Sequence, residues 1–178
     1  AHSHFYDLCL ATELATEYLD KAFAAMTEAR LGRTIDVVLE NALDKATVNP
    51  YVGSLWIRRH AEQKRLSECI NRLDWMVRQG ATALWHCAAR EYLQACGQLN
   101  LPEQIKTFIK RYGRSLQAET QSWGVAGTAL YNLGEMQGTA DWMLEWEERR
   151  DVTAWMLWDL ALALRALGRE EESRCVSN

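Results

Sequence analysis

Apolar residues recur three and four positions apart along most of this chain, which is the spacing of one buried face of an α-helix. A clear example is the series Trp123, Ala126, Leu130 and Leu133. Strict alternation of apolar and polar residues, which a half-buried β-strand requires, persists nowhere along the sequence. The pattern therefore predicts an all-α protein.

The same pattern predicts about ten helices in five pairs. The first pair combines a long opening helix, from Phe5 to Ala29, with a helix from Thr34 to Thr47. The other expected helices span residues 51–61, 66–78, 83–95, 102–112, 122–133, 139–149, 152–167 and 169 onward. Asn49 followed by Pro50 is a start signal for one of them, and Asn100 and Thr139 are expected to cap two others.

A short segment that ends in glycine recurs along the chain. Residues 129–134 read ALYNLG and residues 163–168 read ALRALG, an offset of 34 residues. Earlier points of similar character lie at Gly97, Gln63 and Gly32, so the successive intervals are 31, 34, 37 and 34. Each point is expected to be the tight turn of a helical hairpin, because the residue after a helix often adopts positive φ. We expect residues 1–178 to form one repeat domain with turns near 32, 63, 97, 134 and 168.

This spacing of hairpins resembles that of the tetratricopeptide repeat (TPR) family. The residues that match the family pattern most closely are Trp123, Ala126-Gly127, Leu130 and Gly134, with leucine in place of the usual aromatic residue. A second match with the same spacing comprises Leu157, Leu160-Ala161, Leu164 and Gly168. The resemblance implies a TPR-like right-handed αα-superhelix, a solenoid of about five hairpins. Residues 66–82 also resemble a pentatricopeptide-type hairpin, and that alternative stays open.

The resemblance to tetratricopeptide repeats implies a function as well as a fold. Such a stack lines its concave surface with the first helix of each hairpin and holds an extended segment of another protein there. We therefore expect a non-enzymatic scaffold with a protein or peptide partner. The expected groove residues are Glu91, Gln94, Tyr131, Asn132, Trp158 and Arg165.

One class of partner is not expected. Family members that capture the acidic C-terminus of chaperones use Lys, Asn and Lys at successive turns of first helices. The matching positions here hold Gly124, Thr128 and Asn132 in one repeat and Cys87, Glu91 and Ala95 in another. Because neither set contains a lysine, the resemblance does not extend to binding of chaperone tails.

Composition and charge add an alternative. The 178 residues are 48% hydrophobic and 25% charged, which is typical of one globular domain and excludes wholesale disorder. The net charge is −4, so nucleic acid is not the expected partner. Residues 58–114, however, hold 11 Lys or Arg against 5 Asp or Glu, and this basic middle makes RNA binding the alternative function. Most of its charge comes from Arg58, Arg59, Lys64, Arg65, Arg72, Lys106, Lys110 and Arg111.

Eight tryptophans are an unusual number for this length. Four of them lie near one position of successive first helices, where we expect large side chains to fill the space between hairpins: Trp56, Trp85, Trp123 and Trp158. Trp142 and Trp146 are four residues apart and would share one face of the expected helix 139–149. They are expected to pack against Trp155, and the alternative is an exposed aromatic shelf that grips a ligand.

The sequence contains no recognisable catalytic or metal-binding motif. GxSxG and GxxxxGK[ST] are absent, and His86 and Cys87 point about 100° apart on a helix because they are adjacent. Glu13 and Glu17 share a helical face and form either an acid–base pair or, more simply, a solvated stripe. We expect no catalytic residue, no metal and no cofactor. A third functional reading is a regulatory domain that acts in cis within a larger enzyme.

The lack of a recognisable targeting signal and the pattern of cysteines favour a cytoplasmic location. No run approaches the roughly 18–20 apolar residues of a membrane span, and the first four residues lack the pattern of a signal peptide. The five cysteines form no CxxC motif, and all are expected to be small buried residues in a reducing compartment.

Residues 152–167 are apolar nearly all the way round the expected helix. Such a helix is expected to be covered on both sides. The sequence therefore predicts either that this chain is a segment of a longer protein or that it forms a homodimer through its C-terminal hairpin.

Overall fold

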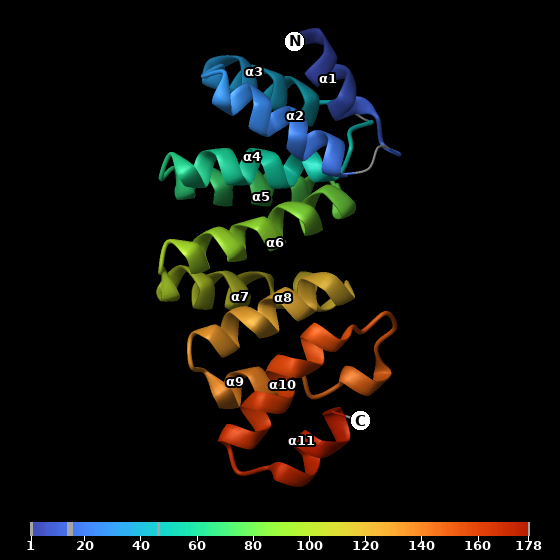
Figure 1. The fold of residues 1–178 in the computed structure, drawn as a ribbon, viewed down its shortest axis with the longest axis vertical. Helices are drawn as coiled ribbons and strands as arrows, with labels where there is room; N and C mark the ends of the chain where they lie inside the picture. The colour runs from blue at the N-terminus through green and yellow to red at the C-terminus, as the bar shows by residue number, and fades with distance from the viewer. Residues whose placement is uncertain (1, 14–15, 46, 178) are drawn as a thin grey trace. The chain divides into compact units, whose positions relative to one another are not determined.

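The computed structural model describes residues 2–13, 16–45 and 47–177, and every regular element within these ranges is a helix (Figure 1). No β-strand occurs among them. The all-α class predicted from the hydrophobic periodicity is therefore confirmed. The chain forms two compact units, residues 1–92 and residues 93–178.

Unit 1 is built from the helices of the N-terminal half. They are α1 (His2–Leu10), α2 (Thr16–Glu28), α3 (Gly32–Leu43), α4 (Tyr51–Glu62), α5 (Leu66–Arg78) and most of α6 (Thr82–Gln98). Helix α3 contacts α1, α2 and α4, and α4 contacts α5. The fully buried side chains of this unit include Phe5, Leu19, Ile35, Leu55 and Leu73.

Unit 2 contains the remaining helices. They are α7 (Pro102–Gln117), α8 (Thr120–Asn132), α9 (Met136–Trp142), the short 3₁₀ helix η1 (Trp146–Glu148), α10 (Ala154–Ala166) and α11 (Glu170–Ser177). Helix α10 contacts α8, α9 and α11, so it lies at the centre of the C-terminal packing. The core around it contains Trp123, Met143, Met156, Leu160 and Val176.

A left-handed residue ends the first helix of each hairpin. These residues are Arg30, Lys64, Asn100, Gly134 and Gly168, at successive intervals of 34, 36, 34 and 34. The amide that follows each one donates to the carbonyl five positions earlier, at 2.9–3.1 Å. This is the hydrogen-bond pattern that closes the C-terminus of a helix with a residue of positive φ. We refer to α2, α4, α6, α8 and α10 as the first helices and to the helices that follow them in the sequence, α3, α5, α7, α9 and α11, as the second helices.

Of the four glycines predicted to form turns, two do so and two do not. Gly134 and Gly168 adopt positive φ, but Gly32 is the first residue of α3 and Gly97 lies inside α6. The left-handed positions near them belong to Arg30 and Asn100. The cap expected at Asn100 is also wrong, because that residue forms the turn and Leu101 occupies the N-cap position of α7 without a side-chain hydrogen bond.

The long opening helix predicted from Phe5 to Ala29 is wrong, because α1 ends at Leu10 and α2 begins at Thr16. Residues 14, 15 and 46 of the two expected helices lie outside the described residues. The break has a long-range cause. The backbone amide of Asn49 donates to the Cys9 carbonyl at 2.9 Å, and its side chain donates to the Ala11 carbonyl at 2.9 Å. Asn49 thus provides hydrogen-bond donors to carbonyl groups at the end of α1.

The helix predicted over residues 139–149 is also wrong in its bounds. Helix α9 ends at Trp142, and Thr139 lies inside it, where its hydroxyl donates to the Glu135 carbonyl. The Trp142 carbonyl accepts the indole N–H of Trp123 at 3.1 Å, and the Trp142 indole donates back to the Trp123 carbonyl at 2.9 Å. This reciprocal pair ties the end of α9 to α8 and ends the helix early.

None of the five cysteines, all of which lie in the described ranges, forms a disulfide, and they are not all buried. Cys9, Cys69 and Cys96 are core residues, and burial raises the pKa of the Cys9 thiol to about 12. Cys87 is half-buried and Cys175 is exposed, so the expectation of five buried thiols is wrong for these two.

The left-handed turns allow a test of backbone strain. Lys64 has φ of 61° and an exposed side chain, so Lys64→Gly relieves a strained conformation and we expect it to raise the free energy of unfolding by about 0.5 kcal/mol. Gly134→Ala, at the equivalent turn, should lower it by about 1 kcal/mol. Urea denaturation measures both, and a destabilised Lys64→Gly variant would contradict the assigned turn.

A second test concerns the close approach of α4 and α6 in unit 1. A Cβ added at Gly53 would lie 2.8 Å from the Leu84 carbonyl oxygen, which is backbone and cannot move aside. We expect Gly53→Ala to cost about 2 kcal/mol of stability. The control is Gly97→Ala in α6, where an added Cβ meets no atom of the described residues within 4 Å. That variant should gain about 0.5 kcal/mol in the same measurement.

Candidate functional site

A polar network centred on Arg58 joins three first helices of unit 1. The guanidinium donates to both carboxylate oxygens of Glu91 on α6, at 2.9 and 3.1 Å, and to Asp20 on α2 at 2.9 Å. The Tyr51 hydroxyl donates to Asp20 at 2.7 Å and accepts from Arg58 at 3.1 Å. The four side chains, which we call the Arg58 network, therefore satisfy one another.

The electrostatics of the Arg58 network favour a structural role. The hydrogen bonds that Arg58 donates to Glu91 raise the pKa of the Arg58 guanidinium, which stays charged at any physiological pH. Burial, together with the hydrogen bond to Asp20, raises the pKa of Tyr51 to about 12. The Glu91 side chain is only 14% exposed and its carboxylate is occupied by Arg58. Glu91, which the sequence predicts as a groove residue, is thus mostly buried and hydrogen-bonded to Arg58.

Much of the predicted basic middle is neutralised by ion pairs. Arg59 pairs with Asp36 at 2.8 Å, and Lys106 pairs with Glu135 at 2.5 Å. Arg72 pairs with Glu40 and Asp44, and its guanidinium also lies over the rings of Trp56 and Trp75.

With Arg58 and Arg65 included, at least five of the eight named basic residues are in ion pairs with described residues. Most of the partner carboxylates come from outside residues 58–114. Unit 1 as a whole contains 11 basic and 12 acidic residues. The charge asymmetry along the sequence therefore largely disappears in space.

The first helices of the two units make equivalent polar contacts. In unit 1, Arg58 lies six residues before its left-handed turn and contacts Glu91, nine residues before the next turn. In unit 2, Thr128 also lies six residues before its turn, and its hydroxyl donates at 2.5 Å to Asp159, nine residues before the next. Successive first helices thus meet in the same register in both units.

An aromatic stripe on α10 is the largest apolar feature left open on a first helix. It consists of Trp155, Trp158, Leu162 and Arg165, which are spaced three, four and three residues apart and therefore share one face. Trp155 is 43% exposed and Trp158 is 67% exposed, while Leu162 is half-buried. Within the described residues, Arg165 is exposed and forms no ion pair. We call these four residues the α10 stripe.

The opposite face of α10 is in the core, where Met156, Leu160, Ala163 and Leu164 are buried. The packing of α10 against α8, α9 and α11 therefore uses one face and leaves the stripe open. Within this chain, residues 152–167 are therefore covered on one side only, and cover for the other side by a longer protein or a second copy stays a prediction.

The other tryptophans pack as core or near-core residues. Trp56, Trp85 and Trp123 are buried as predicted, whereas Trp158 is not. Trp142 and Trp146 are half-buried against the C-terminal core, but they do not share a helix, and Trp155 lies outside that core. The alternative of an exposed shelf at Trp142 and Trp146 is therefore wrong, and the exposed aromatic surface is on α10.

The structure brings together only some of the predicted groove residues. Trp158 and Arg165 lie on the α10 stripe, and Asn132 is exposed at the end of α8. Tyr131 is half-buried, and Gln94 is exposed on α6. Sequence reasoning did not identify Trp155 and Leu162 as exposed, because an all-round apolar helix has no polar face to mark the exposed side. It also missed the Thr128–Asp159 contact, which joins residues 31 positions apart on different helices.

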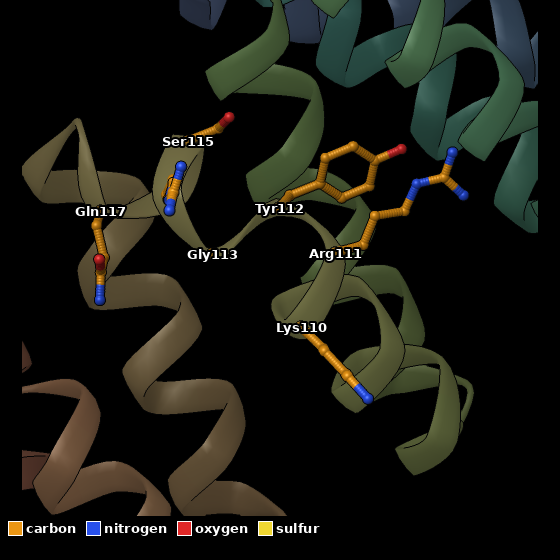
Figure 2. A pocket seen from close by; sticks show the side chains of 7 residues that line it. Lys110, Arg111, Tyr112, Gly113, Ser115 and Gln117 are labelled. Carbon is orange, nitrogen blue, oxygen red and sulfur yellow. The ribbon is translucent and has the colours of Figure 1, made fainter.

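A pocket at the end of α7 is a poor anion site. Its lining includes Lys110, Arg111, Tyr112 and Arg114 (Figure 2). Figure 2 shows Lys110 and Arg111 pointing away from each other, and the Arg111 guanidinium lies 5.3 Å from the Tyr112 ring centre. The C-terminal end of a helix also carries a partial negative charge, which opposes a bound phosphate. These basic groups do not converge on a ligand.

No group of three His, Cys, Asp or Glu side chains in the described part of the chain is arranged to hold a metal ion. Glu17 forms an ion pair with Lys21 and is exposed, as is Glu13, which lies in the turn after α1, outside any helix. The described helices include none that is both long and apolar enough to cross a membrane. Searches against protein-family models, curated proteins and solved structures find no match for this chain.

The Arg58 network generates a stability prediction. Arg58→Met leaves the carboxylates of Asp20 and Glu91 without their cation, and we expect it to lower the free energy of unfolding by about 2 kcal/mol. Arg65→Met is the matched control, because its pair with Glu68 is exposed to solvent and should contribute little to stability. Urea denaturation compares the two variants. Equal losses would show that the network does not tie the helices together.

Proposed function

We propose that this chain is a tetratricopeptide-like repeat protein that acts, without catalysis or a cofactor, as a scaffold for a partner protein. The proposed fold is a right-handed stack of helical hairpins. Two observations support it: the left-handed turns recur every 34–36 residues, and first helices meet in the same register in both units. In such a stack the first helices line the binding surface.

The observation that carries the proposal is the exposure of the α10 stripe on a first helix. Trp155 and Trp158 together leave roughly 250 Å² of aromatic surface open to solvent. Covering that area would contribute about 6 kcal/mol before the costs of association. Exposed aromatic residues next to a cation are characteristic of protein-binding surfaces, where Trp and Arg are the residues that contribute most to affinity.

The proposed mechanism is capture of an extended segment along α10. An apolar side chain of the segment packs on Trp158, and a carboxylate pairs with Arg165. These two residues are seven positions apart, so they are about 10 Å apart along the helix axis, the span of about three residues of extended chain. On α8, Asn132 offers amide donors and an acceptor to the segment backbone.

The ion pairs of the basic middle argue against RNA as the partner. A backbone of phosphates needs unpaired cations along one surface, whereas Arg58, Arg59 and Arg72 are already held by carboxylates. RNA recovery is nevertheless one arm of the test below, because the sequence by itself permits that function.

The scaffold proposal is tested by affinity capture from a source lysate with and without nuclease. We expect a protein to be retained by the wild-type chain after nuclease treatment and to be reduced at least about tenfold by Trp158→Ala or Arg165→Glu, a loss of about 1.4 kcal/mol. Tyr18→Ala on α2 is the matched control, because Tyr18 is also an exposed aromatic residue, at 58%, and lies outside the stripe. It should leave capture unchanged.

Three outcomes would overturn the proposal. Equal loss with Tyr18→Ala would indicate non-specific adhesion. Recovery of RNA that disappears with nuclease would favour the basic middle. Capture of nothing by the wild-type chain would favour a regulatory role within a larger protein.

A further inference from the structure

We infer that the α10 stripe is also the surface through which two copies of this chain associate, with the two α10 helices antiparallel. This goes beyond the scaffold function and does not rest on it. The occupant is a second copy because the stripe is complementary to itself. Its order of residues, two tryptophans followed by a leucine and an arginine, supplies both halves of each contact.

The spacing of the stripe has two-fold symmetry. Its midpoint is residue 160, with Trp158 and Leu162 two residues on either side and Trp155 and Arg165 five residues on either side. When two such helices pack antiparallel about this midpoint, Trp158 faces Leu162 of the second copy. Trp155 then faces Arg165 of the second copy, and both contacts occur twice.

The chemistry of these contacts selects the antiparallel arrangement. The Arg165 guanidinium over a tryptophan ring is a cation–π pair, and tryptophan is the best ring for it. A parallel pair would instead place the two Arg165 side chains against each other, and like charges at an interface are strongly unfavourable. The open cation and the open aromatic residue therefore satisfy each other only in the antiparallel register.

The exposed area of the stripe determines how strongly two chains can associate. The exposed surface of Trp155 and Trp158 amounts to roughly 500 Å² over two chains, which is below the 1,200 Å² or more that stable interfaces bury. The association is therefore weak and reversible. Because Trp158 and Arg165 serve both contacts, a second copy and a partner segment compete for the stripe.

The test is sedimentation velocity of the purified chain over a concentration series up to about 200 μM, which reaches weak association. Two variants at one position separate the arrangements. Trp155→Arg places an arginine opposite Arg165 of the second copy, and we expect it to abolish association. Trp155→Glu places a carboxylate there, which forms an ion pair in the antiparallel dimer, and should associate at least about tenfold more tightly than Trp155→Arg.

The matched controls are Tyr18→Arg and Tyr18→Glu on α2, an exposed aromatic site outside the stripe, and neither should change association. Circular dichroism at 222 nm checks that each variant is folded. A wild-type chain that stays monomeric over the whole series would overturn the inference. Equal weakening by Trp155→Arg and Trp155→Glu would also overturn it, because a parallel or non-specific contact responds to both charges alike. These measurements use the chain alone, so failure to capture a partner protein does not affect them.

Discussion

The left-handed turn that ends each first helix is the constraint on which the rest of this structure depends. A residue with positive φ at Arg30, Lys64, Asn100, Gly134 or Gly168 reverses the chain, and the amide after it closes the helix end. Each turn thereby fixes where the second helix begins. Because the turns recur at intervals of 34 to 36 residues, side chains at a given distance before a turn occupy equivalent places in different hairpins.

This equivalence explains how charges distant in sequence come together. Arg58 and Thr128, each six residues before a turn, contact Glu91 and Asp159, each nine residues before the next. In unit 1 Arg58, Arg59 and Arg72, which contribute to the basic middle of the sequence, are neutralised by ion pairs with carboxylates. In unit 2 the corresponding contact is a single neutral hydroxyl on a carboxylate, and the exposed aromatic residues and the exposed cation of α10 lie on either side of Asp159 in the sequence. The α10 stripe and the Arg58 network thus belong to different units.

Where the expectations failed, a long-range contact or an unmarked turn residue was responsible. The opening helix divides because Asn49, nearly 40 residues away, binds the carbonyls at the end of α1. Helix α9 stops at Trp142 because the indole of Trp123 takes its terminal carbonyl. Three of the left-handed turns are formed by arginine, lysine and asparagine, which do not predict positive φ as glycine does. Only the turns at Gly134 and Gly168 could therefore be located from a glycine in the sequence. At the ends of α1 and α9, local propensity was overruled by a partner that the local sequence does not contain.

The sequence by itself determined that this protein is helical, because a period of 3.6 residues in apolar positions is a local property that any core requires. It also determined the approximate interval between the turns, whereas Trp158, which it placed between hairpins, is exposed. Only the tertiary structure decided which face of α10 stays open and which basic residues are neutralised. Both depend on contacts between segments 20 to 40 residues apart, such as Asp20 with Arg58 and Arg72 with Glu40. A helix that is apolar on every side does not reveal from its own residues which side its neighbours cover.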